Sequence, residues 1–203
     1  MPRLARRRRG PAQLDAPAGK RLVLHVGCGP RDHYTLHESF RRPEWHEVRL
    51  DVDPGVKPDI VASITDMAPV PTDAVDAVFS HHNIEHVFAH EVPVALAEFL
   101  RVLRPGGEVL IATPDLQSVA RVIASGRLEE TLYRAEVGEV APLDIVYGLR
   151  CDIERGREYM AHRTGYTART LGLRLHQAGF AGVQIAVEGW ALWARARKPA
   201  RAA

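Results

Sequence analysis

The sequence predicts an α/β fold, a three-layer sandwich built on a mostly parallel sheet, and three observations lead to this prediction. Apolar stretches of strand length alternate with helix-like patterns over residues 21–113, the order expected of βαβ units. The first stretch runs directly into a glycine-rich turn, as a buried parallel strand does. The last two stretches flank a Glu188-Gly189 turn and predict a closing antiparallel hairpin.

The first half of the pattern contains four expected strands, at residues 22–26, 47–52, 59–63 and 75–80. The first is apolar apart from His25, and the second ends in acids before a Pro54-Gly55 turn. The third is short, and the fourth is flanked by polar residues. Between the first two, residues 32–41 are expected to form a helix with Asp32 as its N-cap.

In the second half, residues 92–103 have the apolar spacing of an amphipathic helix, which Arg104-Pro105-Gly106-Gly107 ends before a fifth strand at 108–113. Residues 114–166 contain helical patterns at 119–123 and 143–147 but no convincing strand, so we expect a helical insertion over the carboxyl edge of the sheet. A helix at 167–178 precedes the hairpin strands at 183–187 and 190–196.

The chain of 203 residues suits one domain, and its positive charge lies at the two ends. Residues 1–9 carry five arginines and residues 195–203 four basic groups; because the net charge is only +2, the stretch between has seven net negative charges. We therefore expect a domain at residues 20–198 between disordered tails at 1–19 and 199–203. A nucleic-acid partner is disfavoured, since the basic groups lie in the tails and not on the folded body.

The composition favours a cytoplasmic protein. No apolar run approaches the length that spans a bilayer, and no apolar segment follows the basic N-terminus as in a secretory signal. Cys28 and Cys151 are isolated, which indicates neither a disulfide framework nor a metal knuckle and favours a reducing compartment.

Gly27-Cys28-Gly29, after the first strand, is suited to hold a ligand close to the backbone. It does not continue as a dinucleotide fingerprint, because Asp32 stands where the third glycine is required. Asp51, and after it Asp53, can accept hydrogen bonds from ribose hydroxyls. Asp66 and Met67, beyond the third strand, suit an adenine amino group and ring, although taken alone they are better explained by a surface turn.

Together these segments resemble the successive motifs of class I S-adenosylmethionine-dependent methyltransferases, in particular the small-molecule type. The motifs are Val23-Leu-His-Val-Gly-Cys-Gly29, Leu50-Asp51, Thr65-Asp66-Met67, Asp76-Ala-Val-Phe-Ser80, Asn83-Ile-Glu-His-Val87 and Val102-Leu-Arg-Pro-Gly-Gly107. The likeness spans residues 21–113, and the final helix and hairpin fit the family's Rossmann-like seven-stranded sheet.

The resemblance implies S-adenosylmethionine as cofactor. It places Gly27, Cys28 and Gly29 at the methionine portion, Asp51 and Val52 at the ribose, Asp66 and Met67 at the adenine, and Ser80 and His81 beside the sulfonium. His25 departs from the pattern, because the family usually has an acid there that helps to hold the cofactor's ammonium group.

The candidate catalytic residues follow the fourth strand and end the insertion. His82, Glu85 or His86 is expected to line the acceptor pocket, where a neutral imidazole can take a proton. A capped or hydrogen-bonded structural role is an equally open alternative for each histidine. Residues 158–167 are expected to form a lid with His162 pointing inward, although Thr167 also suits a plain helix cap. A metal at His82, His86 and His90, which would share a helical face, is the less favoured interpretation, so no metal is predicted.

The predicted reaction is an in-line methyl transfer to an oxygen or nitrogen nucleophile, in which positioning matters more than a base. A small-molecule acceptor is favoured, because the chain lacks both the Asn/Asp-Pro-Pro-Tyr/Phe motif typical of exocyclic amine methylation and a separate recognition domain. The sequence leaves the oligomeric state open between monomer and homodimer. Two alternatives remain: a non-catalytic partner module, and an NAD(P)-dependent enzyme.

Overall fold

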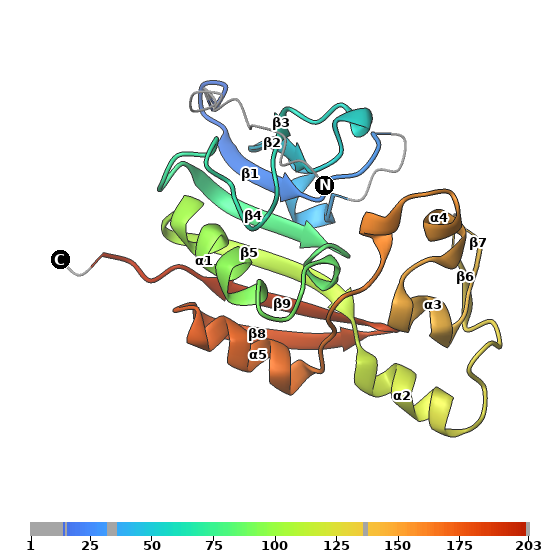
Figure 1. Cartoon of the computed structure of the whole chain (residues 1–203). Coiled ribbons are helices and arrows are strands. Elements are labelled where there is room, and N and C mark those ends of the chain that lie inside the picture. Colours follow the sequence, from blue (N-terminus) through green and yellow to red (C-terminus); the bar gives the residue numbers. More distant parts are fainter. Residues whose placement is uncertain (1–13, 15, 32–35, 136–137, 202–203) are drawn as a thin grey trace.

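A seven-stranded sheet forms the centre of the computed structural model, which describes residues 14, 16–31, 36–135 and 138–201 (Figure 1). Its order is β3-β2-β1-β4-β5-β9-β8. The strands are β1 (Arg21–Val26), β2 (Trp45–Asp51), β3 (Ile60–Val61), β4 (Val75–His81), β5 (Leu103–Pro114), β8 (Ala181–Glu188) and β9 (Ala191–Arg197). Only the pairs that include β9 are antiparallel. This confirms the mostly parallel sheet and its closing hairpin.

One face of the sheet is covered by α1 (Val92–Val102) and α5 (Ala168–Gln177) (Figure 1). The side of α1 that carries Leu96 and Phe99 is buried against the sheet, which stabilises the fold by about 1.5–3 kcal/mol for each large side chain. The hydroxyl of Thr167 accepts a hydrogen bond from the Thr170 amide, which confirms the expected cap of α5.

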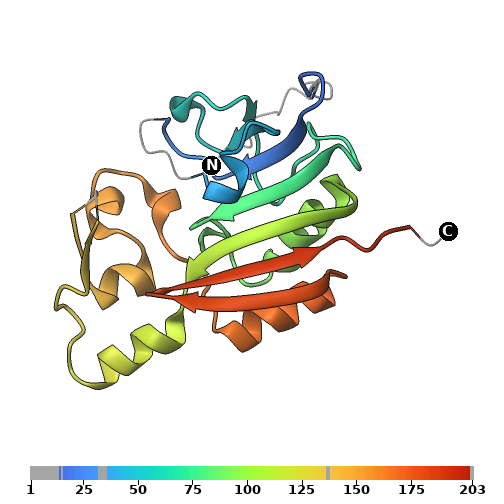
Figure 2. The same ribbon diagram turned by 180° about the vertical axis from the view of Figure 1, so that it is seen from behind.

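The opposite face carries a thinner layer (Figure 2). There the short 3-10 helix η1 (Glu38–Phe40) buries Phe40 against Trp45 and Phe79 in a second, smaller core. Of the helix expected at residues 32–41, positions 32–35 lie outside the described residues, Asp32 among them, and η1 is the helical part of the remainder.

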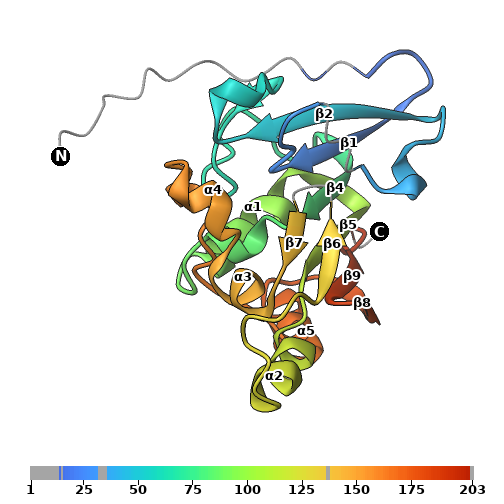
Figure 3. The ribbon, with the colours of Figure 1, turned by 90° about the vertical axis from the view of Figure 1, so that its right-hand side faces the viewer.

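The insertion after β5 lies at the carboxyl edge of the parallel strands and has a small core of its own (Figures 1 and 3). It contains α2 (Leu116–Ala124), β6 (Tyr133–Ala135), β7 (Gly138–Val140), α3 (Pro142–Tyr147), α4 (Arg150–Glu154) and the 3-10 helix η4 (Glu158–Met160). The expectation that it holds no strand was wrong. β6 and β7 are three residues each and almost wholly exposed, so no alternation of buried side chains marks them in the sequence.

The two ends of the insertion meet. Asp115 forms a parallel bridge with Tyr166, and the Leu116 amide donates to the Tyr166 carbonyl at 2.9 Å. The insertion is therefore a closed excursion from the edge of the sheet. Two further 3-10 turns, η2 (Pro54–Val56) and η3 (Ile84–His86), follow β2 and β4 at the same edge.

At the chain ends, Leu14 and Ala16 pack against the main core, and Arg201 pairs with Asp73 at 2.8 Å. The disorder expected for the tails stays a prediction, because most of the N-terminal one lies outside the described residues. None of the helices among the residues described has the length and apolar character needed to cross a membrane.

Candidate functional site

The turn after β1 forms a cradle with Asn83, which follows β4. Gly27 (φ +63°) lies so close to Asn83 that an added Cβ would come within 2.4 Å of the Asn83 Cγ. Among the described residues, the buried Asn83 Nδ2 and the buried Ser80 Oγ have no hydrogen-bond partner. A tight glycine turn beside two unpartnered polar atoms fits a polar ligand that approaches the backbone closely.

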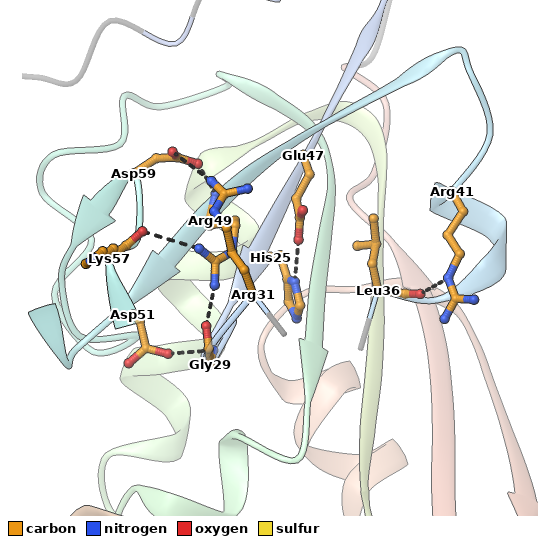
Figure 4. Close-up of polar contacts among 10 residues, drawn as sticks. All are labelled: His25, Gly29, Arg31, Leu36, Arg41, Glu47, Arg49, Asp51, Lys57 and Asp59. Atoms are coloured by element: carbon orange, nitrogen blue, oxygen red, sulfur yellow. Dashed lines mark hydrogen bonds and ion pairs between the residues drawn. The ribbon is translucent and has the colours of Figure 1, made fainter. Parts of the chain in front are cut away.

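Asp51 closes the cradle from the end of β2. Its Oδ2 accepts from the Gly29 amide and its Oδ1 from the Asp53 amide, each at 2.9 Å (Figure 4). The buried Arg49 guanidinium donates to the Gly29 carbonyl and, at 3.3 Å, to that of Lys57. The turn is thus held through both its amide and its carbonyl. Burial raises the pKa of the Cys28 thiol to about 12, so this side chain stays protonated.

His25 is paired with an acid from the neighbouring strand. Its Nδ1 lies 2.7 Å from Glu47 Oε1, and the His25 ring is 2% exposed (Figure 4). The position where the family usually has an acid is therefore connected to a carboxylate on β2. Sequence reasoning missed Glu47. The signal was the alternation of β2, because His25 pairs with Arg49 in register and Glu47 lies two residues earlier on the same face.

The residues expected at the adenine lie apart from this network. Asp66 lines a shallow depression of 350 Å³ together with residues of α1, including Glu98 and Arg101. Met67 is fully buried in the main core, and its amide donates to Glu98 at 2.7 Å. Val52, expected at the ribose, is 55% exposed. Their roles toward a nucleoside remain predictions.

A buried carboxylate connects the end of β4 to β5. Glu85 is 1% exposed; its Oε1 lies 3.2 Å from His82 Nδ1, and its Oε2 accepts from the Thr113 hydroxyl at 3.0 Å. Burial raises the pKa of this carboxyl group, but the hydrogen bond to His82 and the nearby imidazoles of His86 and His162 outweigh it and bring the pKa to about 2. The group is therefore an ionised carboxylate whose partners are imidazoles and a hydroxyl.

The two adjacent histidines at the end of β4 differ in environment. His81 is neutral, because burial, reinforced by His82, lowers its pKa to about 3. His82 is 42% exposed and has φ +45°, a conformation that a residue with a side chain adopts at a cost of about 1 kcal/mol or more. Its Nδ1 lies on Glu85, and among the described residues Nε2 has no hydrogen-bond partner, so Nε2 is the ring nitrogen left for a ligand.

His86 and His162 connect the turn after β4 to the end of the insertion. Their rings meet edge to face with centroids 4.9 Å apart. His86 Nδ1 lies 3.3 Å from the Ala161 carbonyl and its Nε2 lies 3.1 Å from that of His82, while His162 Nδ1 lies 2.7 Å from the Ile145 carbonyl. The structure thus brings together all four predicted catalytic side chains, with His82, His86 and His162 around Glu85.

The segment expected to be a lid is anchored at both sides of the carboxyl edge. The Arg163 and Thr164 amides donate to the Glu85 carbonyl at 2.8 and 3.1 Å, and the Tyr159 hydroxyl donates to Asp53 at 2.9 Å. The Arg163 guanidinium lies over the Phe88 ring, 4.8 Å from its centroid.

The metal arrangement considered from the sequence does not form, because η3 covers only Ile84–His86 and no helix joins the three histidines. Potential ligand atoms of Glu85, His86 and His162 do lie within 4.8 Å of one another. Both ring nitrogens of His86, however, lie at hydrogen-bond distance from backbone carbonyls, so we interpret the group as a polar network and assign it no metal.

Gly27→Ala is expected to destabilise the protein more than Gly29→Ala. Both residues have φ near +60°, so alanine suffers the same backbone strain at either position. Of the two, only Gly27 would bring its new methyl group against a described side chain, whereas no described residue has an atom within 4 Å of a Cβ at Gly29. The expected difference is about 1–3 kcal/mol in the free energy of unfolding, measured by urea denaturation. Equal losses would contradict the close contact with Asn83.

Comparisons with known proteins agree with this geometry. Residues 24–111 match the model of a family described as a methyltransferase domain. A malonyl-[acyl-carrier protein] O-methyltransferase from Yersinia pestis is 30% identical over 118 residues, which cover 54% of this chain and 39% of that protein. The chain therefore spans less than half the length of this curated relative.

Solved structures share the fold at low sequence identity. A SAM-dependent methyltransferase from Methanosarcina mazei superposes with a TM-score of 0.60 at 12% identity, covering 91% of this chain and 95% of that one. A SAM-dependent methyltransferase from Archaeoglobus fulgidus gives a TM-score of 0.59 at 15% identity, covering 89% of this chain and 87% of that one. The Burkholderia thailandensis 1,6-didemethyltoxoflavin-N1-methyltransferase, solved with bound 1,6-didemethyltoxoflavin and S-adenosylhomocysteine, gives a TM-score of 0.53 at 15% identity, covering 89% of this chain and 72% of that one.

Proposed function

We propose, from the premise that the chain carries a class I S-adenosylmethionine-dependent methyltransferase domain, that the protein transfers the methyl group of this cofactor to an oxygen or nitrogen of a small molecule. The observation that carries the proposal is the ionised Glu85 carboxylate on His82, placed directly after the strand that supplies Ser80 and His81. A buried anion beside an exposed imidazole suits proton removal next to a cationic methyl donor.

The residues of the cradle fit the cofactor. The lack of a side chain at Gly27 lets Asn83 pack against the turn, and Asn83 Nδ2 and Ser80 Oγ supply unused hydrogen-bonding atoms. Asp51 is placed to accept from ribose hydroxyls at the end of β2. When bound, S-adenosylmethionine supplies a methyl group on a positively charged sulfur, already activated as a leaving group. The neutrality of His81 avoids repulsion of that charge.

On the acceptor side, the four clustered side chains have different proposed roles. His82 takes the proton through Nε2, and Glu85 orients the ring and stabilises the imidazolium that forms. Thr113 holds the second carboxylate oxygen, so the pair is fixed from β5 as well. His86 and His162 act as positioning residues, because their ring nitrogens hold the lid and the turn after β4 through backbone carbonyls.

The proposal is tested by calorimetric titration with S-adenosylmethionine and S-adenosylhomocysteine, with NADH as the control ligand. We expect saturable micromolar binding of both sulfur compounds and none of NADH. Binding of NADH alone would favour the nicotinamide-dependent alternative, and no binding at millimolar ligand would favour a partner module without catalysis.

In the active enzyme, His86→Ala is expected to lower turnover by less than about tenfold, because His86 positions other groups and does not itself transfer the proton.

A further inference from the structure

A cavity of 220 Å³ lies next to the His82–Glu85 pair. It is formed where the end of β5 and the start of β9 face the insertion, and it is lined by His82, Pro114, Tyr133, Ile145, Trp190 and Ala191. Two of these side chains are large aromatic rings and one is a proline. The cavity is larger than the roughly 150 Å³ that holds a benzene molecule, so it accommodates one substituted ring or a small fused pair.

We propose that this cavity binds an uncharged aromatic compound with a hydroxyl on the ring, and that this phenolic oxygen is the methyl acceptor. The inference rests on the proposed function and specifies its substrate class.

The lining argues for a neutral, flat ligand. Among the described residues that line the cavity, none is an Asp, Glu, Lys or Arg, so a phosphate or carboxylate would be buried without a counter-charge. Tyr133 and Trp190 contribute two aromatic rings to the lining, and aromatic rings favour contact with another aromatic ring. Trp190 is held in place because it packs against the small core of the insertion, and its carbonyl accepts from the Asp115 amide at 2.8 Å.

The proton chemistry argues for a phenol. An amine nucleophile in its neutral form has a free lone pair and needs no base, whereas a hydroxyl must lose its proton. A phenolic hydroxyl ionises near pH 10, whereas water, whose hydroxyl resembles that of an aliphatic alcohol, ionises only near pH 15.7. An imidazole therefore removes a proton from a phenol far more readily than from an aliphatic alcohol. His82 is the one lining residue with a basic ring, and Glu85 stabilises its charged form.

The phenol, the cofactor and His82 account for every bond and proton in this methyl transfer. The phenolic oxygen forms its bond to the methyl carbon, its proton passes to Nε2 of His82, and the electron pair of the breaking carbon–sulfur bond stays on the sulfur. The products are an aryl methyl ether and S-adenosylhomocysteine, and the imidazolium beside Glu85 returns its proton to water.

The test uses 4-nitrophenol, whose phenolate absorbs visible light, titrated into the full-length protein with and without saturating S-adenosylhomocysteine. At a pH where the free compound is mostly protonated, we expect binding together with the phenolate band. Glu85→Gln is expected to abolish the band while changing the dissociation constant less than about threefold, because Glu85 lies behind His82 and outside the lining. 4-Nitroanisole, which has no ionisable proton, is the control for ring binding.

Tyr133→Leu provides the test of stacking, with Tyr147→Leu as its matched control, because Tyr147 is 61% exposed and does not line the cavity. We expect Tyr133→Leu to weaken 4-nitrophenol binding about fivefold and Tyr147→Leu to leave it unchanged. Equal effects of both variants would overturn the proposal, as would equal affinity for cyclohexanol or tighter binding of 4-nitrobenzoate. Failure of S-adenosylhomocysteine to bind would instead overturn the proposed function.

Discussion

Replacing Asp51 by alanine is expected to weaken the binding of S-adenosylhomocysteine about 100-fold. The carboxylate sits at the end of β2 and accepts from the Gly29 and Asp53 amides, so it both shapes the cradle and faces the proposed ribose. Loss of hydrogen bonds to a charged acceptor costs about 1.5–3 kcal/mol, and 2.7 kcal/mol corresponds to 100-fold in the dissociation constant. Isothermal titration calorimetry measures the change directly.

Two variants separate a ligand contact from a folding effect. Asp51→Asn keeps one oxygen acceptor and the shape of the side chain, so it is expected to recover part of the lost affinity. Asp53→Ala removes the acceptor of the Tyr159 hydroxyl but leaves Asp51 in place, and is expected to change affinity less than tenfold. If Asp53→Ala proved as damaging as Asp51→Ala, Asp51 would not be the ribose ligand.

Glu85→Gln is expected to lower turnover about 100-fold or more with little change in the affinity for S-adenosylhomocysteine. The amide keeps the volume of the buried side chain but cannot stabilise an imidazolium on His82, and general-base catalysis contributes typically 10²–10⁴-fold. Thr113→Val, which removes only the hydroxyl that holds Oε2, is expected to have a smaller effect. Turnover of Glu85→Gln within threefold of the wild type would show that the pair does not move the proton.

The same variant reports on the ionisation of Glu85. Its pKa is lowered from 4.5 to about 2 in the folded state, so the carboxylate contributes stability that is present above pH 4.5 and lost as the pH falls toward 2. Between about pH 5.5 and pH 3, the unfolding free energy of the wild type is expected to fall more than that of Glu85→Gln.

The parallel sheet was predictable because β1 and the apolar part of β5 are short apolar runs bounded by glycine or proline, and β2 ends in an acid. The sequence was less informative where tertiary contacts override local signals. Residues 104–107 suggest a turn, yet β5 begins at Leu103 and pairs with Val75 across a register shift. The exposed β6–β7 pair leaves no periodic pattern at all.

For the candidate site, the residue types near the strand ends were predictable, and their partners were not. The sequence pointed to His82 and Glu85, but the Thr113 hydroxyl that completes the pair lies on β5, 28 positions from Glu85. Likewise, nothing local to His25 indicates Glu47, because the contact depends on the register of two parallel strands. Met67, expected to pack on the adenine ring, is fully buried in the main core, and its role toward a nucleoside stays a prediction.

The meeting of Asp115 and Tyr166 has a consequence for how acceptor preference can diverge. Because the chain leaves and re-enters the sheet edge at neighbouring points, the excursion between them can change in length or sequence with little entropic cost to the strands. The excursion supplies Tyr133 and Ile145 to the cavity, whereas the glycine cradle and Asp51 come from strands outside it. A change confined to the excursion is therefore expected to alter the proposed acceptor cavity while leaving the glycine cradle and Asp51 unchanged.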